Sequence, residues 1–359
     1  MFERQESSSV TAARRPPSPS DTIPGRARAV HLVARPEGRL TTAVFREVEV
    51  PVPVPGPGHV LVRAENLGVA AVMRERMDVD SDLPVPPYAL GEPPIGPAVG
   101  TVVVSSVDAV PVGTPVGYWG PWAEYAEVAA DAVLVLDPGL LPAPHYHLAT
   151  PNGATALHGL RDVAGVGEGD VVLVSGAAGG VGSLAGQIAR RLGAARVIGT
   201  AGSAEKCRWL VDELGFDAAV DHHVDDLVGA LRAHAPDGIS VYLDLVGGAQ
   251  FEAAVAVAAT RARIAVGGAL ATQQAGAPWP RLDTRTAIVK GLTIQGFTLF
   301  RAPHVLGEWP ALFGRWLAEG MSYPHTVVDG GLRDLPRAMV DLVDGRHRGH
   351  VSVRVARPR

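Results

Sequence analysis

The pattern of apolar and polar positions divides the chain into a first part of short strands and a middle part of alternating strands and helices. In the first part, short apolar runs are separated by Pro- and Gly-rich turns, a pattern typical of an all-β barrel or sandwich. The strands predicted there cover 28–33, 44–50, 59–66, 99–104, 115–118, 123–128 and 132–136. The stretch PVPVPGPG at 51–58 is expected to connect two of them, because proline lacks the backbone donor of a central strand.

From about residue 150 the period of the hydrophobic pattern changes, and apolar strands alternate with helices. Strands are predicted at 170–175, 196–200, 218–221, 241–245, 262–266 and 292–297. Helices are predicted at 154–164, 182–192, 204–214, 224–233 and 250–259. This alternation indicates βαβ units in a doubly wound parallel sheet, whose strands are covered on both faces and therefore continuously apolar. A helix at 310–319 and strands at 326–328 and 351–355 complete the pattern.

Composition narrows the class of protein. The 359 residues are 47% hydrophobic and 19% charged, which is enough apolar material for sizeable cores. The net charge of −5 gives no electrostatic drive toward nucleic acid or anionic membranes, and neither is expected as a partner. A single cysteine, Cys207, excludes a disulfide framework and fits the cytoplasm. Residues 1–25 have no apolar segment of the secretory type and are expected to form a disordered tail.

The most informative motif is DVVLVSGAAGGVGSLAGQIARRLGA at 170–194. An apolar strand leads into a glycine-rich turn, and a helix follows from about Val181. A dinucleotide pyrophosphate needs a tight turn, close backbone approach and a helix N-terminus, and this context supplies all three. The long uncharged run 171–189 is therefore interpreted as strand, turn and helix rather than as a membrane span.

The end of the next strand distinguishes NAD from NADP. An NAD site places an acid there to hold the ribose 2′-hydroxyl. Here the sequence VIGTAGSAEKCRWL has no acid at 200–203 and offers Ser203 and Lys206 instead. A missing carboxylate beside a cation favours a 2′-phosphate, so the cofactor is predicted to be NADPH.

At this point the sequence resembles a known family. The motifs GAAGGVG, GTAGSAEK, LGFDAAVDH, DLVGG (244–248) and IAVGGA (264–269) are similar to those of the medium-chain dehydrogenase/reductase superfamily. Within it, the chain resembles the zinc-independent prostaglandin reductases, alkenal double-bond reductases and quinone oxidoreductases. The resemblance implies a GroES-like β-barrel domain at 26–149 and 300–359, and a Rossmann NADP-binding domain at 150–299. It further implies NADPH, a homodimer paired through the strand at 292–297, and hydride delivery to the β-carbon of an activated alkene.

The resemblance also implies roles for individual residues. The pyrophosphate would lie on Gly179–Gly182, the 2′-phosphate near Ser203 and Lys206, and the nicotinamide near Thr155 and Phe297. The complete set of cofactor residues is Thr155, Gly176, Ala178, Gly179, Gly180, Val181, Gly182, Thr200, Gly202, Ser203, Lys206, His222, Val246, Val266, Gly267, Gly268, Phe297, Thr298, Leu299 and His347.

Several positions depart from the family pattern. Val72 in AAVMR (70–74) stands where the relatives carry a pocket tyrosine, and Gln273 or a neighbour replaces another. His222 replaces a tyrosine at the 2′-phosphate, and His347 in GRHRGH (345–350) replaces an asparagine. The predicted substrate pocket comprises Val72, Trp119, Gln273 and Phe297. Substrate specificity is therefore expected to differ from that of the relatives.

No metal is expected. The catalytic cysteine, the Gly-His-Glu motif and the four-cysteine lobe of zinc alcohol dehydrogenases are missing. The pairs His145/His147 and His222/His223 have metal-like spacing, but no further ligands accompany them in the sequence, so they are interpreted as surface or linker residues.

The proton donor is left open. Reduction of an enone builds negative charge on the carbonyl oxygen, and a proton must then reach the α-carbon. Tyr88, Tyr118 and Trp119, with Trp122, are candidates that either donate or only line the cleft.

The leading hypothesis is an NADPH-dependent, zinc-independent reductase of an α,β-unsaturated carbonyl compound or quinone. One alternative is a tailoring enzyme of secondary metabolism that performs a different reduction or a cyclisation on the same fold. A second alternative is a non-catalytic NADPH-binding sensor.

Overall fold

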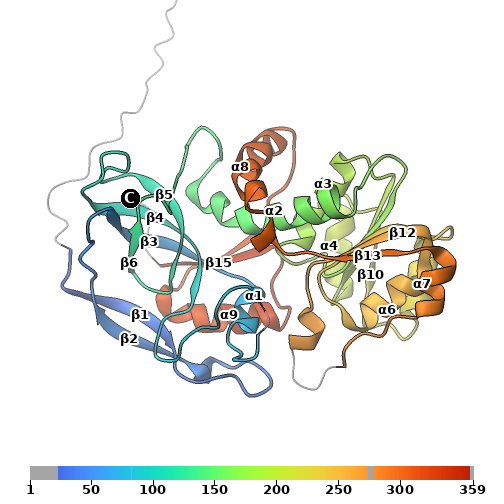
Figure 1. The fold of residues 1–359 in the computed structure, drawn as a ribbon, viewed down its shortest axis with the longest axis horizontal. Coiled ribbons are helices and arrows are strands. Elements are labelled where there is room, and N and C mark those ends of the chain that lie inside the picture. Colours follow the sequence, from blue (N-terminus) through green and yellow to red (C-terminus); the bar gives the residue numbers. More distant parts are fainter. Residues whose placement is uncertain (1–22, 82, 274–277, 356–359) are drawn as a thin grey trace, which may run out of the picture.

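The computed structural model describes residues 23–81, 83–273 and 278–355, and the predicted tail at 1–25 lies almost entirely outside this range. Figure 1 shows antiparallel strands at one end of the molecule and a parallel sheet with its helices at the other. This division agrees with the change of hydrophobic period near residue 150. The predicted fold class, a Rossmann sheet with a second, β-rich GroES-like domain, is confirmed.

The β-rich domain contains two sheets within the described residues. The antiparallel pair β1 and β2 forms one of them, and β3, β4 and β5 form the centre of the other. The bounds are β1 Arg26–Leu32, β2 Phe45–Pro51, β3 His59–Val69, β4 Ile95–Ser105, β5 Pro115–Pro121, β6 Tyr125–Ala129 and β7 Leu134–Val135. The proline-rich stretch 51–58 connects β2 to β3, as predicted. The short helix α1 (Val72–Glu75), which the sequence did not reveal, follows β3.

The other domain is built on a parallel sheet with the strand order β10-β9-β8-β11-β12-β13 in the described part of the chain. The strand bounds are β8 Val171–Val174, β9 Arg196–Ala201, β10 Ala218–Asp221, β11 Ile239–Asp244, β12 Ala258–Val266 and β13 Thr293–Gly296. The first strand of the domain, β8, lies between β9 and β11, so the direction of strand addition reverses there. Ligands of open parallel sheets bind at such a switch point, beyond the carboxyl ends of the strands.

Helices cover this sheet, and most agree with the sequence prediction. The bounds are α2 Thr150–Leu157, α3 Gly182–Arg191, α4 Ala204–Leu214, α5 Leu227–His234, α6 Gly248–Val257 and α7 Thr284–Lys290. The helix predicted at 154–164 is α2 followed by a π-helical turn, His158–Val163. Helix α7 was not predicted.

The predicted start of the helix at 310 is wrong. Helix α8 spans Pro303–Ala318, with Pro303 in its first turn and Pro310 inside it. Its residues Val305, Trp309 and Phe313 are fully buried in the hydrophobic cluster that also contains α2 and α3 residues. In this packing α8 contacts the helices of the Rossmann domain, and the division at residue 300 stays a prediction.

After α8 the chain returns to the β-rich domain. Strands β14 (His325–Val328) and β15 (His350–Arg354) extend its larger sheet, with β15 paired antiparallel to β3. Helix α9 (Leu335–Val343), which the sequence analysis missed, packs Leu335 and Met339 into the same core as β3. No helix in the described residues is long and apolar enough to cross a bilayer.

Candidate cofactor and substrate site

The glycine-rich loop connects β8 to α3 at the switch point of the parallel sheet. Gly176 adopts a φ of +56°, which favours glycine. A Cβ on Gly182 would lie 2.4 Å from the Gly176 carbonyl oxygen, and one on Gly180 would lie 2.6 Å from Nδ2 of Asn152. Glycine at these positions keeps the turn tight and leaves the N-terminus of α3 open to an anion. The strand–turn–helix predicted around 170–194 is confirmed in this form.

The loop after β11 faces the glycine-rich loop across the same switch point. Asp244 is buried, and its Oδ1 accepts hydrogen bonds from Ser175 Oγ at 2.9 Å and from the backbone N of Gly247 at 2.8 Å. A Cβ on Gly176 would lie 3.0 Å from Cγ2 of Val246, so the two loops are in contact. Asp244 therefore holds this backbone in place, and Val246 lies beside the glycine turn.

The end of β9 provides the expected adenosine side of the site. Ser203 caps α4, accepting a hydrogen bond from Lys206 N at 3.2 Å, and no acid stands at 200–203. Thr200 donates to Gln250 Oε1 at 2.5 Å, a partner that the sequence analysis did not identify. Gly202 lies between these residues, with His222 Nε2 3.4 Å from the position of a Cβ.

Lys206 points from α4 toward the segment 345–349. Its Nζ donates to the Gly345 carbonyl oxygen at 2.5 Å. Burial, followed by the nearby charge of Arg348, lowers the pKa of Lys206. His347 lies in the same segment with its Nε2 buried and unpartnered, and burial lowers its pKa. Ser203, Lys206, His222 and His347, predicted separately, are thus brought to one end of the site.

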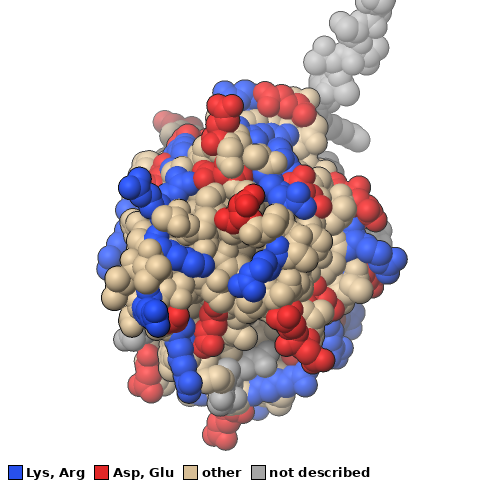
Figure 2. Space-filling model, turned by 90° about the vertical axis from the view of Figure 1, so that its right-hand side faces the viewer, with Lys and Arg blue, Asp and Glu red and all other residues tan. Residues whose placement is uncertain are grey.

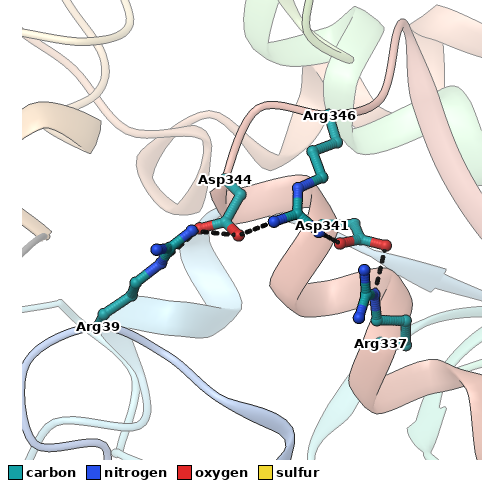
Figure 3. Close-up of polar contacts among 5 residues, drawn as sticks. All are labelled: Arg39, Arg337, Asp341, Asp344 and Arg346. Atoms are coloured by element: carbon teal, nitrogen blue, oxygen red, sulfur yellow. Dashed lines mark hydrogen bonds and ion pairs between the residues drawn. The ribbon is translucent and has the colours of Figure 1, made fainter.

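A network of ion pairs fixes segment 345–349 to α9 (Figure 3). Arg346 contacts both Asp341, at 2.7 Å, and Asp344, at 3.3 Å. Arg39 contacts Asp344 at 2.8 Å, and Arg337 contacts Asp341 at 2.8 Å. Shared carboxylates of this kind position a segment better than an isolated surface pair does. Nothing in the local sequence pattern indicates this support.

The same segment reaches the glycine-rich loop. Gly349 N donates to the Ala178 carbonyl oxygen at 2.9 Å, and Gly179 and Gly349 form an isolated β-bridge. One residue later, Nδ1 of His350 lies 2.8 Å from Nδ2 of Asn152 on α2. Two domains therefore build the site jointly. Asn152 was not among the predicted residues, although it lies three positions before the predicted Thr155.

The expected nicotinamide end lies where α2, β12 and β13 meet. Thr155 Oγ1 donates to the Pro151 carbonyl oxygen at 2.7 Å. The ring of Phe297 packs closely on Gly267, where a Cβ would lie 2.4 Å from it. A Cβ on Gly268 would lie 2.4 Å from the Leu245 carbonyl oxygen, so this turn is also restricted to glycine.

Thr298 caps the turn that begins at Leu299, and its side chain accepts a hydrogen bond from Phe300 N. Val266 accepts from Phe297 N at 2.9 Å.

The predicted pocket residues come from both domains. Val72 begins α1, and Glu75 at the end of α1 accepts a hydrogen bond from Gln273 Nε2 at 3.4 Å. Oε1 of Gln273 is buried without a partner. This contact joins the β-rich domain to the loop after β12 and brings the region of Val72 to Gln273. Trp119 lies on β5 with 47% of its surface exposed. Glu75 was not predicted, because neither its position in the hydrophobic pattern nor its sequence neighbours distinguish it from a surface acid.

The candidate proton donors occupy different environments. Tyr88 is buried and donates to the Ile95 carbonyl oxygen at 2.6 Å, and burial raises its pKa to about 12. Tyr118 is completely buried, its hydroxyl has no partner, and burial raises its pKa strongly. Trp122 is fully buried against Phe45. Their catalytic roles remain predictions.

No metal-binding group of three or more His, Cys, Asp or Glu residues is found in residues 23–81, 83–273 and 278–355. His145 packs 5.1 Å from the ring of His325, and His222 packs 4.0 Å from that of His223. The remaining features fit a dinucleotide: glycines that leave room for phosphates, a helix N-terminus, and cations with a buried, unpartnered imidazole nitrogen at the adenosine end.

Comparisons with known proteins agree with this geometry. The family model described as "Zinc-binding dehydrogenase" matches residues 180–319, and that described as "N-terminal domain of oxidoreductase" matches residues 28–136. The chain belongs to the medium-chain dehydrogenase/reductase superfamily.

Several similar proteins are reductases. The NADPH-dependent curcumin reductase of Escherichia coli is 33% identical over 90% of this chain and 96% of the relative. Prostaglandin reductase 1 of Bos taurus is 36% identical over 74% of this chain and 82% of the relative. The crystal structure of CurA from Vibrio vulnificus in complex with NADPH has a TM-score of 0.85 and 33% identity, and it covers 92% of this chain and 100% of that one.

Proposed function

We propose that this protein is a zinc-independent, NADPH-dependent reductase of the conjugated double bond in α,β-unsaturated carbonyl compounds or quinones. Relatives that match most of the chain are named for this type of reaction, and a solved relative of similar fold holds NADPH. The absent zinc ligands and the glycine-rich switch point agree with the same assignment.

One observation carries the choice of cofactor. At the end of β9, at 200–203, the chain offers no carboxylate for a ribose 2′-hydroxyl, and Lys206 lies beside Gly345 at that end of the site. A carboxylate would repel a 2′-phosphate, whereas an ammonium group and the capped N-terminus of α4 stabilise it. This arrangement supports NADPH over NADH.

The chemistry follows from what the chain's residues can hold. When bound, NADPH supplies a hydride from the nicotinamide ring. Phe297, Gly267 and Gly268 form a rigid wall at the expected nicotinamide end, which favours a defined orientation for transfer. The carbonyl oxygen of the substrate then needs a hydrogen-bond donor. Trp119 is the exposed member of the candidate set, whereas the hydroxyl of Tyr88 already donates to Ile95.

The substrate end is expected to differ from that of tyrosine-lined relatives. Val72 carries no hydroxyl, and Gln273 contributes an amide that contacts Glu75. The pocket would therefore combine an apolar side with an amide and a carboxylate at its mouth. Such a pocket suits an enone that carries a hydrogen-bonding group away from the double bond.

We further propose a cytoplasmic homodimer. Strand β13 is hydrogen-bonded to β12 and exposes all four of its residues. Trp279, Ile288 and Val289 nearby are 75%, 79% and 72% exposed. Figure 2 views the end of the molecule where α7 lies and shows basic and acidic side chains interspersed, with no large area of one sign. An open strand edge with exposed apolar residues suits pairing with a second copy.

The direct test is a fluorescence titration with NADPH and NADH, followed by addition of conjugated enones and quinones. Micromolar or tighter binding of NADPH, with oxidation in the presence of an enone, is the expected result. Binding without oxidation by any conjugated acceptor would favour a tailoring enzyme or a sensor. Failure to bind either nucleotide would contradict the assignment of the glycine-rich loop.

A further inference from the structure

Arg348 lies beside the expected 2′-phosphate position and was not among the cofactor residues identified from the sequence. It follows His347 directly, and its charge is close enough to lower the pKa of Lys206, after the larger effect of burial. Burial is the main cause that lowers the pKa of His347 and of His222, and the charge of Lys206 adds a smaller effect to each. Four basic side chains thus crowd one end of the site. The repulsion between the cations of Arg348 and Lys206 is relieved when an anion binds beside them.

Acids partly balance this cluster: Asp341 acts on His347, Asp221 acts on His222, and Glu205 pairs with Arg348. Arg348 Nη2 forms an ion pair with Glu205 Oε1 on α4. The side chains are 35% and 69% exposed, so the pair is of the weak, solvent-accessible kind. The guanidinium carbon of Arg348 also lies 5.6 Å from the ring centroid of Trp209, which supports the side chain independently of Glu205. Arg348 can therefore exchange one anion for another without leaving its place.

The backbone that carries Arg348 is fixed on both sides. Arg346 is held by Asp341 and Asp344 (Figure 3), and Gly349 N is bonded to the Ala178 carbonyl oxygen. The segment is thereby tied to α9 at one end and to the glycine-rich loop at the other. A change of partner at Arg348 then requires only a side-chain movement.

We propose that Arg348 is a second cation for the 2′-phosphate of NADPH, and that Glu205 occupies it as an internal competitor when no phosphate is bound. This inference rests on the proposed function. A phosphomonoester carries nearly two negative charges and accepts two parallel hydrogen bonds from a guanidinium group, so it displaces a single exposed carboxylate. NADH has a hydroxyl at the same position and leaves the Arg348–Glu205 pair intact. Preference for NADPH therefore includes the exchange of one ion pair for a stronger one.

The proposal can be tested because substitutions of Arg348 and Glu205 should have opposite effects on NADPH affinity. Dissociation constants for NADPH and NADH would be measured by fluorescence titration on the full chain with Arg348→Ala, Arg348→Lys and Glu205→Gln. Arg348→Ala should weaken NADPH binding about tenfold or more and change NADH binding less than twofold. Arg348→Lys should recover part of the loss, because the charge returns without the planar fork. Glu205→Gln should tighten NADPH binding severalfold and leave NADH unchanged.

A control removes charge elsewhere on the same helix. Arg208→Ala deletes an exposed cation of α4 and should weaken NADPH binding less than Arg348→Ala does. If Arg348→Ala and Glu205→Gln weaken NADPH binding equally, or affect NADH as much as NADPH, the pair is only a structural support and the proposal is overturned. An effect of Arg348→Ala no larger than that of Arg208→Ala also overturns it.

Failure of the proposed function is recognised separately. If the unmodified chain binds NADPH no better than NADH, the cofactor assignment is wrong. The proposed role of Arg348 is then wrong as well. If NADPH binds and the variants behave as expected while no enone or quinone is reduced, the proposal for Arg348 holds and the reaction assignment is wrong. Circular dichroism of each variant confirms that these exposed substitutions leave the fold intact.

Discussion

Nδ1 of His350, on the strand β15, lies 2.8 Å from Nδ2 of Asn152, on the helix α2. An amide nitrogen donates, so the imidazole accepts at Nδ1 and is neutral. Both residues belong to the junction of the two domains, and His350 is 2% exposed. This bond joins the C-terminal return of the β-rich domain to the helix that carries Thr155.

Replacing Asn152 should affect stability and cofactor binding together. Asn152→Ala leaves Nδ1 of the buried His350 without a partner, which costs about 1–3 kcal/mol of unfolding free energy. It also removes the side chain that packs on Gly180, so NADPH binding should weaken severalfold. Urea denaturation and NADPH titration measure the two effects.

A matched control for this substitution is Ser352→Ala. Ser352 Oγ lies 2.8 Å from Nε2 of His325, in the neighbouring part of the same aromatic cluster. This variant should lower stability by a similar amount while leaving NADPH affinity within twofold. Equal losses of affinity in both variants would show that the junction, rather than Asn152, supports the loop.

Stability should fall when the pH is lowered below about 6.5. Burial, and then the nearby His145, lowers the pKa of His350 to about 3, and burial lowers that of His325 to about 2. In the unfolded chain these histidines bind protons below about pH 6.5, whereas the folded chain does not. The unfolded state therefore gains protons first, and each histidine should cost about 2 kcal/mol of stability between pH 7 and pH 5.

The expected pH effect can be assigned by substitution. His350→Gln removes one titrating group, so the loss of unfolding free energy between pH 7 and pH 5 should shrink by about 2 kcal/mol. His304→Gln, at an exposed position on α8, should leave the pH dependence unchanged. Urea midpoints at pH 8, 7, 6 and 5 provide the comparison. If the dependence of unfolding free energy on pH is unchanged in His350→Gln, the His350 ring titrates alike in the folded and unfolded states.

The glycine-rich loop should not tolerate a single added methyl group. In Gly182→Ala the new Cβ would meet the Gly176 carbonyl oxygen at 2.4 Å, so the turn must open. Binding of NADPH and NADH should weaken alike, by more than tenfold, because the pyrophosphate is common to both. Gly167→Ala is the control, since that position faces open space. A selective loss of NADPH binding would place the loop at the wrong end of the cofactor.

A charge on the open edge of the parallel sheet should disrupt dimerisation. Ile294 lies on β13 and is 36% exposed. Ile294→Lys should shift the protein to a monomer in sedimentation velocity, because a charged side chain on the open edge strand disfavours pairing with a second copy. Val54→Lys, at an 89% exposed position in the β-rich domain, should leave the oligomeric state unchanged. If wild type is already monomeric at micromolar concentration, the proposed homodimer is wrong.

Local signals predicted some elements completely. The predicted bounds of α4 and β10 agree with the structure, because Ser203 caps the helix start and Gly215, at φ +72°, ends the helix. The predicted glycine turn also agrees, since a strand and a helix flank it. These features depend on residues close together in the sequence.

Other elements depend on tertiary contacts that a local pattern does not contain. Pro310 suggested a helix start, but the burial of Trp309 and Phe313 against α2 carries α8 through it. The partners of Arg348 and Asn152, Glu205 and His350, lie 143 and 198 positions away. Basic residues at 346 and 348 are equally consistent with a solvated turn until the fold brings α4 and α9 to either side of them.

The position of β15 has a consequence for the order of assembly. It pairs with β14 on one side and with β3 on the other, so Val351 lies opposite Val69. During synthesis β3 leaves the ribosome long before β15 exists, and the end of β3 at 66–69 has no partner on that side until the Rossmann domain has been made. The β-rich domain should consequently be the last to become protease-resistant, although most of its residues are translated first.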